Sequence, residues 1–180
     1  VGFTACSQNY TWVAKSGDLE IAPGVYMANL LGAYSNALTL VSDTEKDVLE
    51  QTIEDKNASD WITEQAKIST AQYFAVEQKF DEYSLVLNSD DLSTISQQTE
   101  YYWQYLSSLY EDNGISQDSL NLINTNVYKT SLLFDALYGE DGEKEVSDDE
   151  LKQAYLNDYV KTTFYALSLT DSSGELLSEE

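Results

Sequence analysis

Apolar side chains recur every three or four positions between Ser89 and Tyr138, which is the spacing of one face of an α-helix. The pattern pauses at the acidic turn EDNG, where Gly114 suits the left-handed position just past a helix end. Ser116 then offers a good N-cap for a second helix. We therefore expect two antiparallel helices, with the rest of the chain packed on this hairpin. Their expected inward faces are Leu92, Ile95, Thr99, Tyr102, Trp103, Leu106 and Tyr110 in the first helix, and Leu120, Ile123, Val127, Ser131, Phe134 and Tyr138 in the second.

The chain before this hairpin predicts two more helices. Pro23 can occupy the first turn of one of them, in which Gly32 is a candidate for close contact with another helix. A longer helix is expected over residues 58–87, where apolar residues recur at alternating spacings of four and three. Either Asn57 or Ser59 can cap it.

Two capping-box patterns mark the start of further segments. Ser42 and Glu45 open residues 42–57, which predict a short helix and a loop. Ser147 and Glu150 open a later helix, and this is the sharpest local signal in the chain. Its expected inward residues are Leu151, Ala154, Tyr155 and Tyr159.

Two segments favour β-structure. Residues 11–22 contain two short strand-like runs about Gly17, which predict a small hairpin with Trp12 and Ile21 as apolar contacts. Residues 160–170 are rich in β-branched and aromatic side chains and predict a strand, for which the chain offers almost no partner.

Together these elements predict a mainly α fold with four to five main helices and a small N-terminal β-hairpin. We expect a tether over residues 1–10, a helical domain over residues 11–159 and the start of an incomplete second domain over residues 160–180. The acidic segment 140–150 is a candidate calcium loop, but it lacks the EF-hand pattern of ligands, so a solvated linker is the favoured interpretation. We expect no metal and no other cofactor.

Composition then limits the chemistry. The chain carries a net charge of −23, from 32 acidic residues against nine Lys, with no Arg and no His. Without His there is no Ser-His-Asp or Cys-His catalysis and no His-ligated zinc, and so negative a surface opposes nucleic-acid binding. With 42% apolar residues and 14 Tyr, the chain can still bury a real core. No apolar run approaches the roughly 20 residues that span a bilayer.

The single cysteine, Cys6, ends the sequence FTAC, which resembles the end of a bacterial lipoprotein signal. One cysteine cannot form an internal disulfide. We expect Cys6 to carry a lipid that anchors an exported protein outside the cell membrane. The alternative is an incidental thiol in the N-terminal segment.

Several of these pieces resemble the SurA/PrsA-type extracytoplasmic foldases. They are the FTAC segment, the strand-turn WVAKSGDLEI before a first helix, the helical hairpin YLSSLYEDNGISQDSLNLINTNVYKTSLLFDALY, and VSDDELKQAYLNDYV leading into a strand. The resemblance implies a helical chaperone domain that binds unfolded or newly exported polypeptides, followed by a parvulin-type peptidyl-prolyl isomerase domain. In that family the catalytic His would fall near Phe164 or Tyr165, where this chain has none. We therefore expect no catalytic residue and no isomerase activity in this chain.

A chaperone domain needs apolar surface that stays exposed. Tyr101 and Tyr105 lie off the inward face of their predicted helix, and Phe74 is similarly displaced on the helix before it. We expect these three residues to contact polypeptide clients, because tyrosine is an adaptable contact residue. The alternative is that they pack against other segments of the chain.

Two other classes of function stay open. One is a non-catalytic surface lipoprotein that binds a specific protein partner through its Tyr-rich helices. The other is an enzyme that uses paired carboxylates, which a deep pocket with two close, pKa-shifted carboxyl groups would favour.

Overall fold

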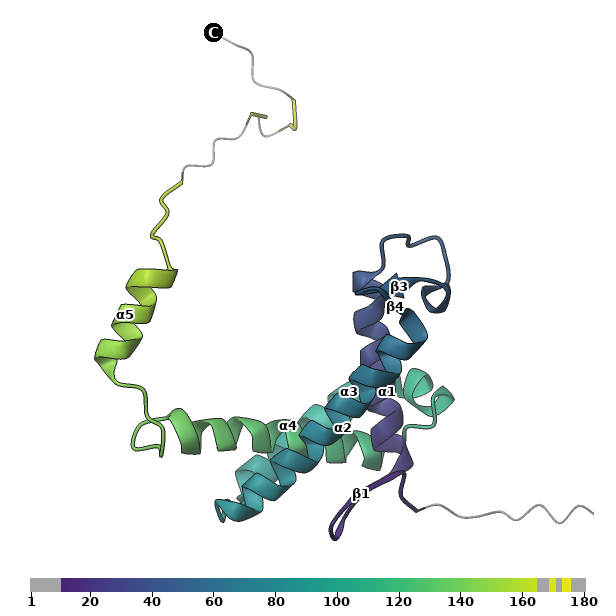
Figure 1. Ribbon diagram of the computed structural model, residues 1–180, viewed down its shortest axis with the longest axis horizontal. Coiled ribbons are helices and arrows are strands. Elements are labelled where there is room, and N and C mark those ends of the chain that lie inside the picture. The colour runs from purple at the N-terminus through teal and green to yellow at the C-terminus, as the bar shows by residue number, and fades with distance from the viewer. Residues whose placement is uncertain (1–10, 165–168, 171–172, 176–180) are drawn as a thin grey trace, which may run out of the picture.

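The computed structural model describes residues 11–164, 169–170 and 173–175, and these residues form a mainly helical fold with five α-helices (Figure 1). The expected N-terminal hairpin is present: β1 (Ala14–Ser16) pairs antiparallel with β2 (Leu19–Ile21). Gly17 adopts the left-handed conformation that this tight turn requires, with a φ of 61°. Ile21 is buried as expected, whereas Trp12 is exposed.

Helices α1 (Pro23–Leu40) and α2 (Ala58–Glu82) pack against each other and hold the largest hydrophobic cluster among the described residues. Pro23 starts α1 and the Asn57 side chain caps α2, as predicted. Small side chains allow the two helices to approach closely. The cluster consists of Ala33, Ala37, Val48, Ile53, Ala58, Trp61, Ile62 and Ala66. The main core therefore lies beside the predicted central hairpin, not within it.

The segment between α1 and α2 differs from the prediction. Residues 42–57 contain a 3₁₀ turn η1 (Val48–Glu50) and a second hairpin of β3 (Thr52–Ile53) and β4 (Lys56–Asn57). The expected capping box is absent, since the Glu45 N–H donates to Asp43 instead. Burial of Val48 and Ile53 on the α1–α2 cluster outweighs the weak local helix signal.

Helices α3 (Ser89–Asp112) and α4 (Gln117–Tyr138) form the expected hairpin, with Asn88 and Ser116 as N-caps. Helix α4 also packs on α1 and α2. The predicted inward faces were only half right. Ile95, Thr99 and Leu120 are buried, but Val127 and Phe134 are 58% and 60% exposed. The end of α4 extends beyond the packed helices (Figure 1), and Phe134 is exposed there, although Leu133 beside it is buried.

The close helix contact occurs at Gly24 rather than at Gly32. A Cβ atom added to Gly24 would lie 2.9 Å from the Cβ of Ser119 and 3.3 Å from the carbonyl oxygen of Gly114, whereas one added to Gly32 would meet nothing within 4 Å. Gly24 therefore lets α1 cross the start of α4, while Gly32 faces open space.

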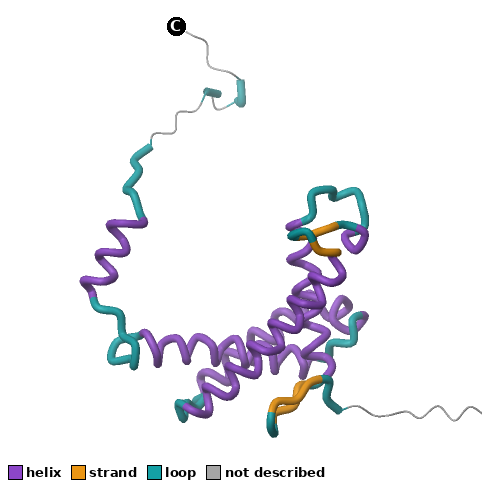
Figure 2. The backbone as a smooth tube through the Cα atoms, in the orientation of Figure 1, coloured by secondary structure: helices purple, strands orange, loops and turns teal. Residues whose placement is uncertain are grey.

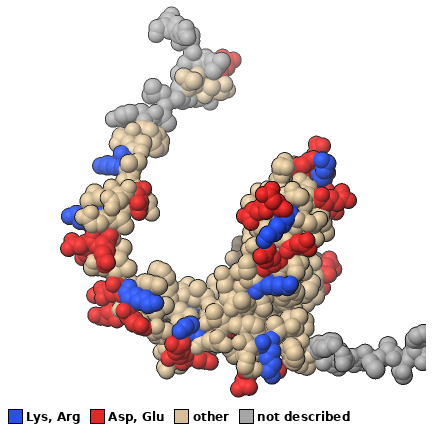
Figure 3. Space-filling view, viewed as in Figure 1, with Lys and Arg blue, Asp and Glu red and all other residues tan. Residues whose placement is uncertain are grey.

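Helix α5 (Asp148–Asp158) has the expected Ser147/Glu150 capping box but buries no residue. The prediction that Leu151 and Tyr155 face inward is wrong, because both are more than half exposed. The tube drawing and the space-filling view show α5 standing apart from the packed helices across an open gap (Figures 2 and 3). Residues 160–164 are exposed and form no strand, and the rest of the predicted strand lies partly outside the described residues.

A candidate polypeptide-binding groove

Helix α1 contains no charged side chain over its whole length, although 23% of the chain is charged. Its polar side chains are Asn29, Ser35, Asn36 and Thr39, and a helix with so few polar positions normally packs against neighbours on more than one side. Here α2 and the start of α4 cover part of α1, and the remaining side stays open, with Tyr34 36% and Leu38 48% exposed. This open side is the first wall of the candidate site.

The second wall comes from α3, which faces α4 mainly through polar groups. The Asn124 amide donates to the Thr99 hydroxyl at 2.9 Å, and the Tyr128 hydroxyl donates to the Asp91 carboxylate at 2.8 Å. The same face of α3 continues beyond these polar groups into apolar residues nearer the end of the helix, which line the cavity beside α1 and α4. Tyr102, Leu106 and Leu109 are 38%, 39% and 46% exposed.

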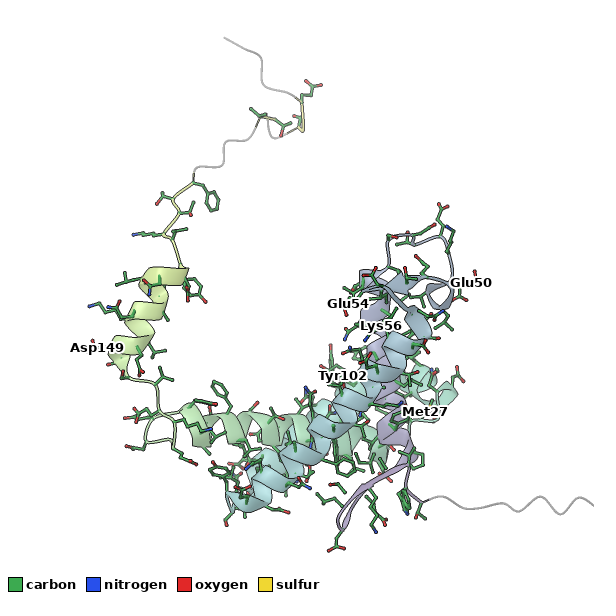
Figure 4. All side chains as sticks on the ribbon, viewed as in Figure 1. Met27, Glu50, Glu54, Lys56, Tyr102 and Asp149 are labelled. Atoms are coloured by element: carbon green, nitrogen blue, oxygen red, sulfur yellow. The ribbon has the colours of Figure 1, made fainter. Side chains whose placement is uncertain are left out.

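Two adjoining cavities lie between these walls. One, of about 360 Å³, is bounded by α1, by α3 and by Leu120 and Ile123 on α4. The other, of about 450 Å³, lies where α1 and the end of α3 meet the start of α2. Leu31 and Leu109 line both cavities, so they form one continuous apolar depression, here named the α1–α3 groove. Met27 lines one part of it and Tyr102 the other (Figure 4).

Three tyrosines gather at the edge of this groove. The ring centroids of Tyr101 and Tyr102 are 5.7 Å apart, and those of Tyr101 and Tyr105 are 5.0 Å apart. Tyr101 and Tyr105 are 60% and 67% exposed, and Tyr102 forms part of the groove wall. The structure thus places two of the predicted client-binding residues beside the groove. We call Tyr101, Tyr102 and Tyr105 the tyrosine cluster.

The third predicted residue, Phe74, is not brought to this site. It lies on α2, is half-buried, and is not among the residues that line the groove. Sequence reasoning also missed Leu109, and it assigned Tyr102 and Leu106 to the interior. The uncharged stretch of α1 was the signal that could have revealed the groove, because such a helix needs apolar cover on more than one side.

The groove is uncharged, and its surroundings are acidic. Burial raises the pKa of the Tyr110 hydroxyl, and the neighbouring Tyr102 adds to the effect, so this lining residue stays neutral at pH 7. Neither α1 nor α3 contains a Lys. The single Lys of α4, Lys129, is paired with Glu77 and lies 5.0 Å from the centroid of the Phe80 ring. Acidic side chains cover more of the face seen in Figure 3 than basic ones do.

The carboxyl groups with resolved pKa shifts lie outside the groove, whose lining residues carry no charge. Within the described ranges no cluster of acidic residues could hold a metal ion, the 140–150 loop included. The pKa of Asp43 is lowered by Lys46 and by the Glu45 N–H, and that of Glu150 by the Ser147 hydroxyl and N–H. Both carboxyl groups lie in caps or turns outside the groove, and neither has the raised pKa of a general acid.

Two further predictions concern the membrane. Cys6 lies outside the described residues, so its proposed lipidation has no structural context here. Of the helices in the described part of the chain, none combines the length and the hydropathy needed to cross a bilayer.

Comparison with known proteins gives no relative: no family model, no curated protein and no solved structure matches this chain. The resemblance to the extracytoplasmic foldases therefore stays a prediction.

Proposed function

We propose that this chain is the holding domain of an extracytoplasmic chaperone, which binds unfolded or newly exported polypeptides in the α1–α3 groove without making or breaking bonds. The observation that carries the proposal is the open side of α1, a helix without charges in a very acidic chain. Exposed apolar surface of this kind, surrounded by polar residues, is characteristic of sites that bind other chains. The surrounding negative charge would keep such a protein soluble while that surface stays open.

Gly32 provides the sharpest test, because it lines the groove and a Cβ atom added there would have no other atom within 4 Å. The variant Gly32→Leu should stabilise the fold by about 0.5–1 kcal/mol, because leucine has a higher helix propensity than glycine. It should at the same time fill the groove and weaken the suppression of aggregation of an unrelated, chemically unfolded protein, followed by light scattering. A variant that is more stable but suppresses aggregation less well cannot owe its loss of function to a failure to fold.

A second pair of variants removes apolar surface instead of filling the groove. The double variant Leu106→Ser/Leu109→Ser should suppress the aggregation of an unfolded protein less well. The matched double variant Leu151→Ser/Leu156→Ser on α5 should suppress it as well as the unchanged chain does. All four leucines are between 39% and 60% exposed, so the two pairs remove similar side chains from similar exposure. If both double variants lost the same amount of aggregation suppression, the binding site could not be the groove.

We also propose that the protein is anchored outside the bacterial cell membrane through a lipid on Cys6. The sequence FTAC at residues 3–6 supports this. Mass spectrometry of the protein from its native membrane fraction should find Cys6 carrying a diacylglycerol group. An unmodified Cys6 in a secreted protein would refute it.

The defined geometry of the tyrosine cluster favours a second candidate, a domain that recognises one specific protein partner. A holding chaperone should suppress aggregation of several unrelated unfolded proteins at similar concentrations. A specific interaction domain should suppress none of them.

A further inference from the structure

The tyrosine cluster presents three aromatic rings to solvent from one side of α3. Successive centroids lie 5.7 Å and 5.0 Å apart, with interplanar angles of 72° and 59°, so the rings are inclined to one another rather than stacked. Inclined rings of this kind expose both faces and edges. The faces carry the negative part of the ring quadrupole, which attracts a cation placed over them.

The flanking helices supply no cation of their own to this cluster. Neither α1 nor α3 has a Lys, while α3 carries Asp90, Asp91, Glu100, Glu111 and Asp112. The chain does make this kind of contact elsewhere, where Lys129 lies over the ring of Phe80. A net charge of −23 further raises the local concentration of any cationic group near the surface.

We propose that the tyrosine cluster binds the cationic side chains of a polypeptide, arginine more strongly than lysine, while the apolar residues of the same segment lie in the α1–α3 groove. This inference rests on the proposed function and adds to it a class of substrate: apolar segments that carry arginine. Arginine is favoured because its planar guanidinium group is weakly hydrated and can lie flat on a ring. Tyr102 belongs to both the cluster and the groove wall, so one segment can reach both.

Labelled peptides that differ only in the side chain at two chosen positions test this proposal directly. A leucine-rich peptide would carry, at two positions, arginine, its uncharged isostere citrulline, lysine or glutamate. Its dissociation constant for the full chain would be measured by fluorescence anisotropy at about 0.15 M salt, where charges more than about 8 Å apart are largely screened. We expect the arginine peptide to bind roughly 2- to 30-fold more tightly than the citrulline peptide.

Variants then locate the contact. Tyr101→Phe/Tyr105→Phe keeps the aromatic faces and should keep the preference for arginine over citrulline. Tyr101→Leu/Tyr105→Leu keeps apolar bulk but removes the rings, and should reduce that preference. The matched control is Tyr155→Leu/Tyr159→Leu on α5, which removes another exposed pair of rings, 5.5 Å apart, and should leave the preference intact.

The possible failures are distinguishable. Equal affinity for the arginine and citrulline peptides, or a preference that survives in Tyr101→Leu/Tyr105→Leu, would overturn the inference and leave the proposed function standing. A preference that disappears with the α5 control would also overturn it, because the cation would then bind elsewhere. Failure of all four peptides to bind would overturn the proposed function as well.

Discussion

The contact between α1 and α2 is mainly apolar, with one hydrogen bond from the Asn29 amide to the Thr70 hydroxyl, whereas the contact between α3 and α4 contains several buried polar groups. Alanines allow the first pair to approach, and Trp61, Ile53 and Val48 fill the space around them. In the second pair the buried residues include Asp91, Thr99 and Asn124, with Ile95 and Leu120 among them. No polar side-chain atom buried in the described part of the chain lacks a hydrogen-bond partner.

This difference explains where the groove comes from. A helix that packs through its apolar side has little apolar surface left for other contacts. On α3, polar groups such as Asp91 and Thr99 make the contact with α4, and the apolar residues Tyr102, Leu106 and Leu109 follow further along the same face, where they stay partly exposed beside the groove. The hydrogen bonds between α3 and α4 then fix how α3 is rotated against α4, because a different rotation would leave buried polar groups without partners. We therefore expect the stability of the fold to come mainly from the α1–α2 contact, whereas the exposed binding surface depends on the α3–α4 contact.

The largest expected loss of stability follows from the apolar contact. Trp61→Ala should lower the free energy of unfolding by about 3–5 kcal/mol, because it leaves a cavity in the main core. It also removes the hydrogen bond of 3.1 Å from the indole N–H to the Glu54 carboxylate, next to a turn in which Glu54 and Asp55 are both left-handed. Urea denaturation followed by circular dichroism would measure the change.

The variant Trp61→Phe is the control for this prediction. It keeps most of the ring volume and loses the hydrogen bond to Glu54, so it should cost far less than the alanine variant. Similar losses for the two variants would mean that the turn, and not the packed core, depends on Trp61.

A smaller loss should follow from the polar contact. Thr99→Val removes the hydroxyl that accepts from the buried Asn124 amide, which then lacks this partner, and should cost about 1–3 kcal/mol. Replacing both partners, in Thr99→Val/Asn124→Leu, should cost less than the sum of the single changes, because no unsatisfied amide remains. Strict additivity in urea denaturation would show that the two groups do not act together.

The sequence predicts local structure well in this chain, because the signals for helix ends are local. Asn57, Ser116 and Ser147 all cap helices where expected. The β3–β4 hairpin escaped prediction, since each strand has two residues and its turn uses Glu54-Asp55 instead of the usual Asn-Gly.

Burial was harder to predict, because it depends on which helices meet. The apolar stripe of α4 is continuous in sequence, but the structure covers Leu120 and leaves Phe134 exposed. The same uncertainty affected the candidate site. The positions of Tyr101 and Tyr105 around the helix predicted their exposure, whereas the wall formed by Leu106 and Leu109 depends on how α3 turns against α4.

The smallest effect on global stability is expected in α5, which lies outside both contacts. Its N-terminus depends on Ser147, whose hydroxyl and N–H interact with the Glu150 carboxylate and hold the pKa of that carboxyl group below its ordinary value of 4.5. A lowered pKa stabilises the helix above the pKa of the unfolded segment, and this contribution is lost as the pH falls through the lower, folded value. Protonation of Glu150 should therefore fray α5 only in acid, below about pH 4.5.

Ser147→Ala should reproduce this fraying at neutral pH, because it removes the cap. Hydrogen exchange of residues 148–158 should become faster in the variant, while the urea midpoint of the whole chain stays unchanged, since α5 buries no residue against the other helices. A lowered midpoint would show that α5 contributes to the packed body in solution. A contact between α5 and the exposed residues of α4, such as Val127 and Phe134, is one arrangement that would account for that result.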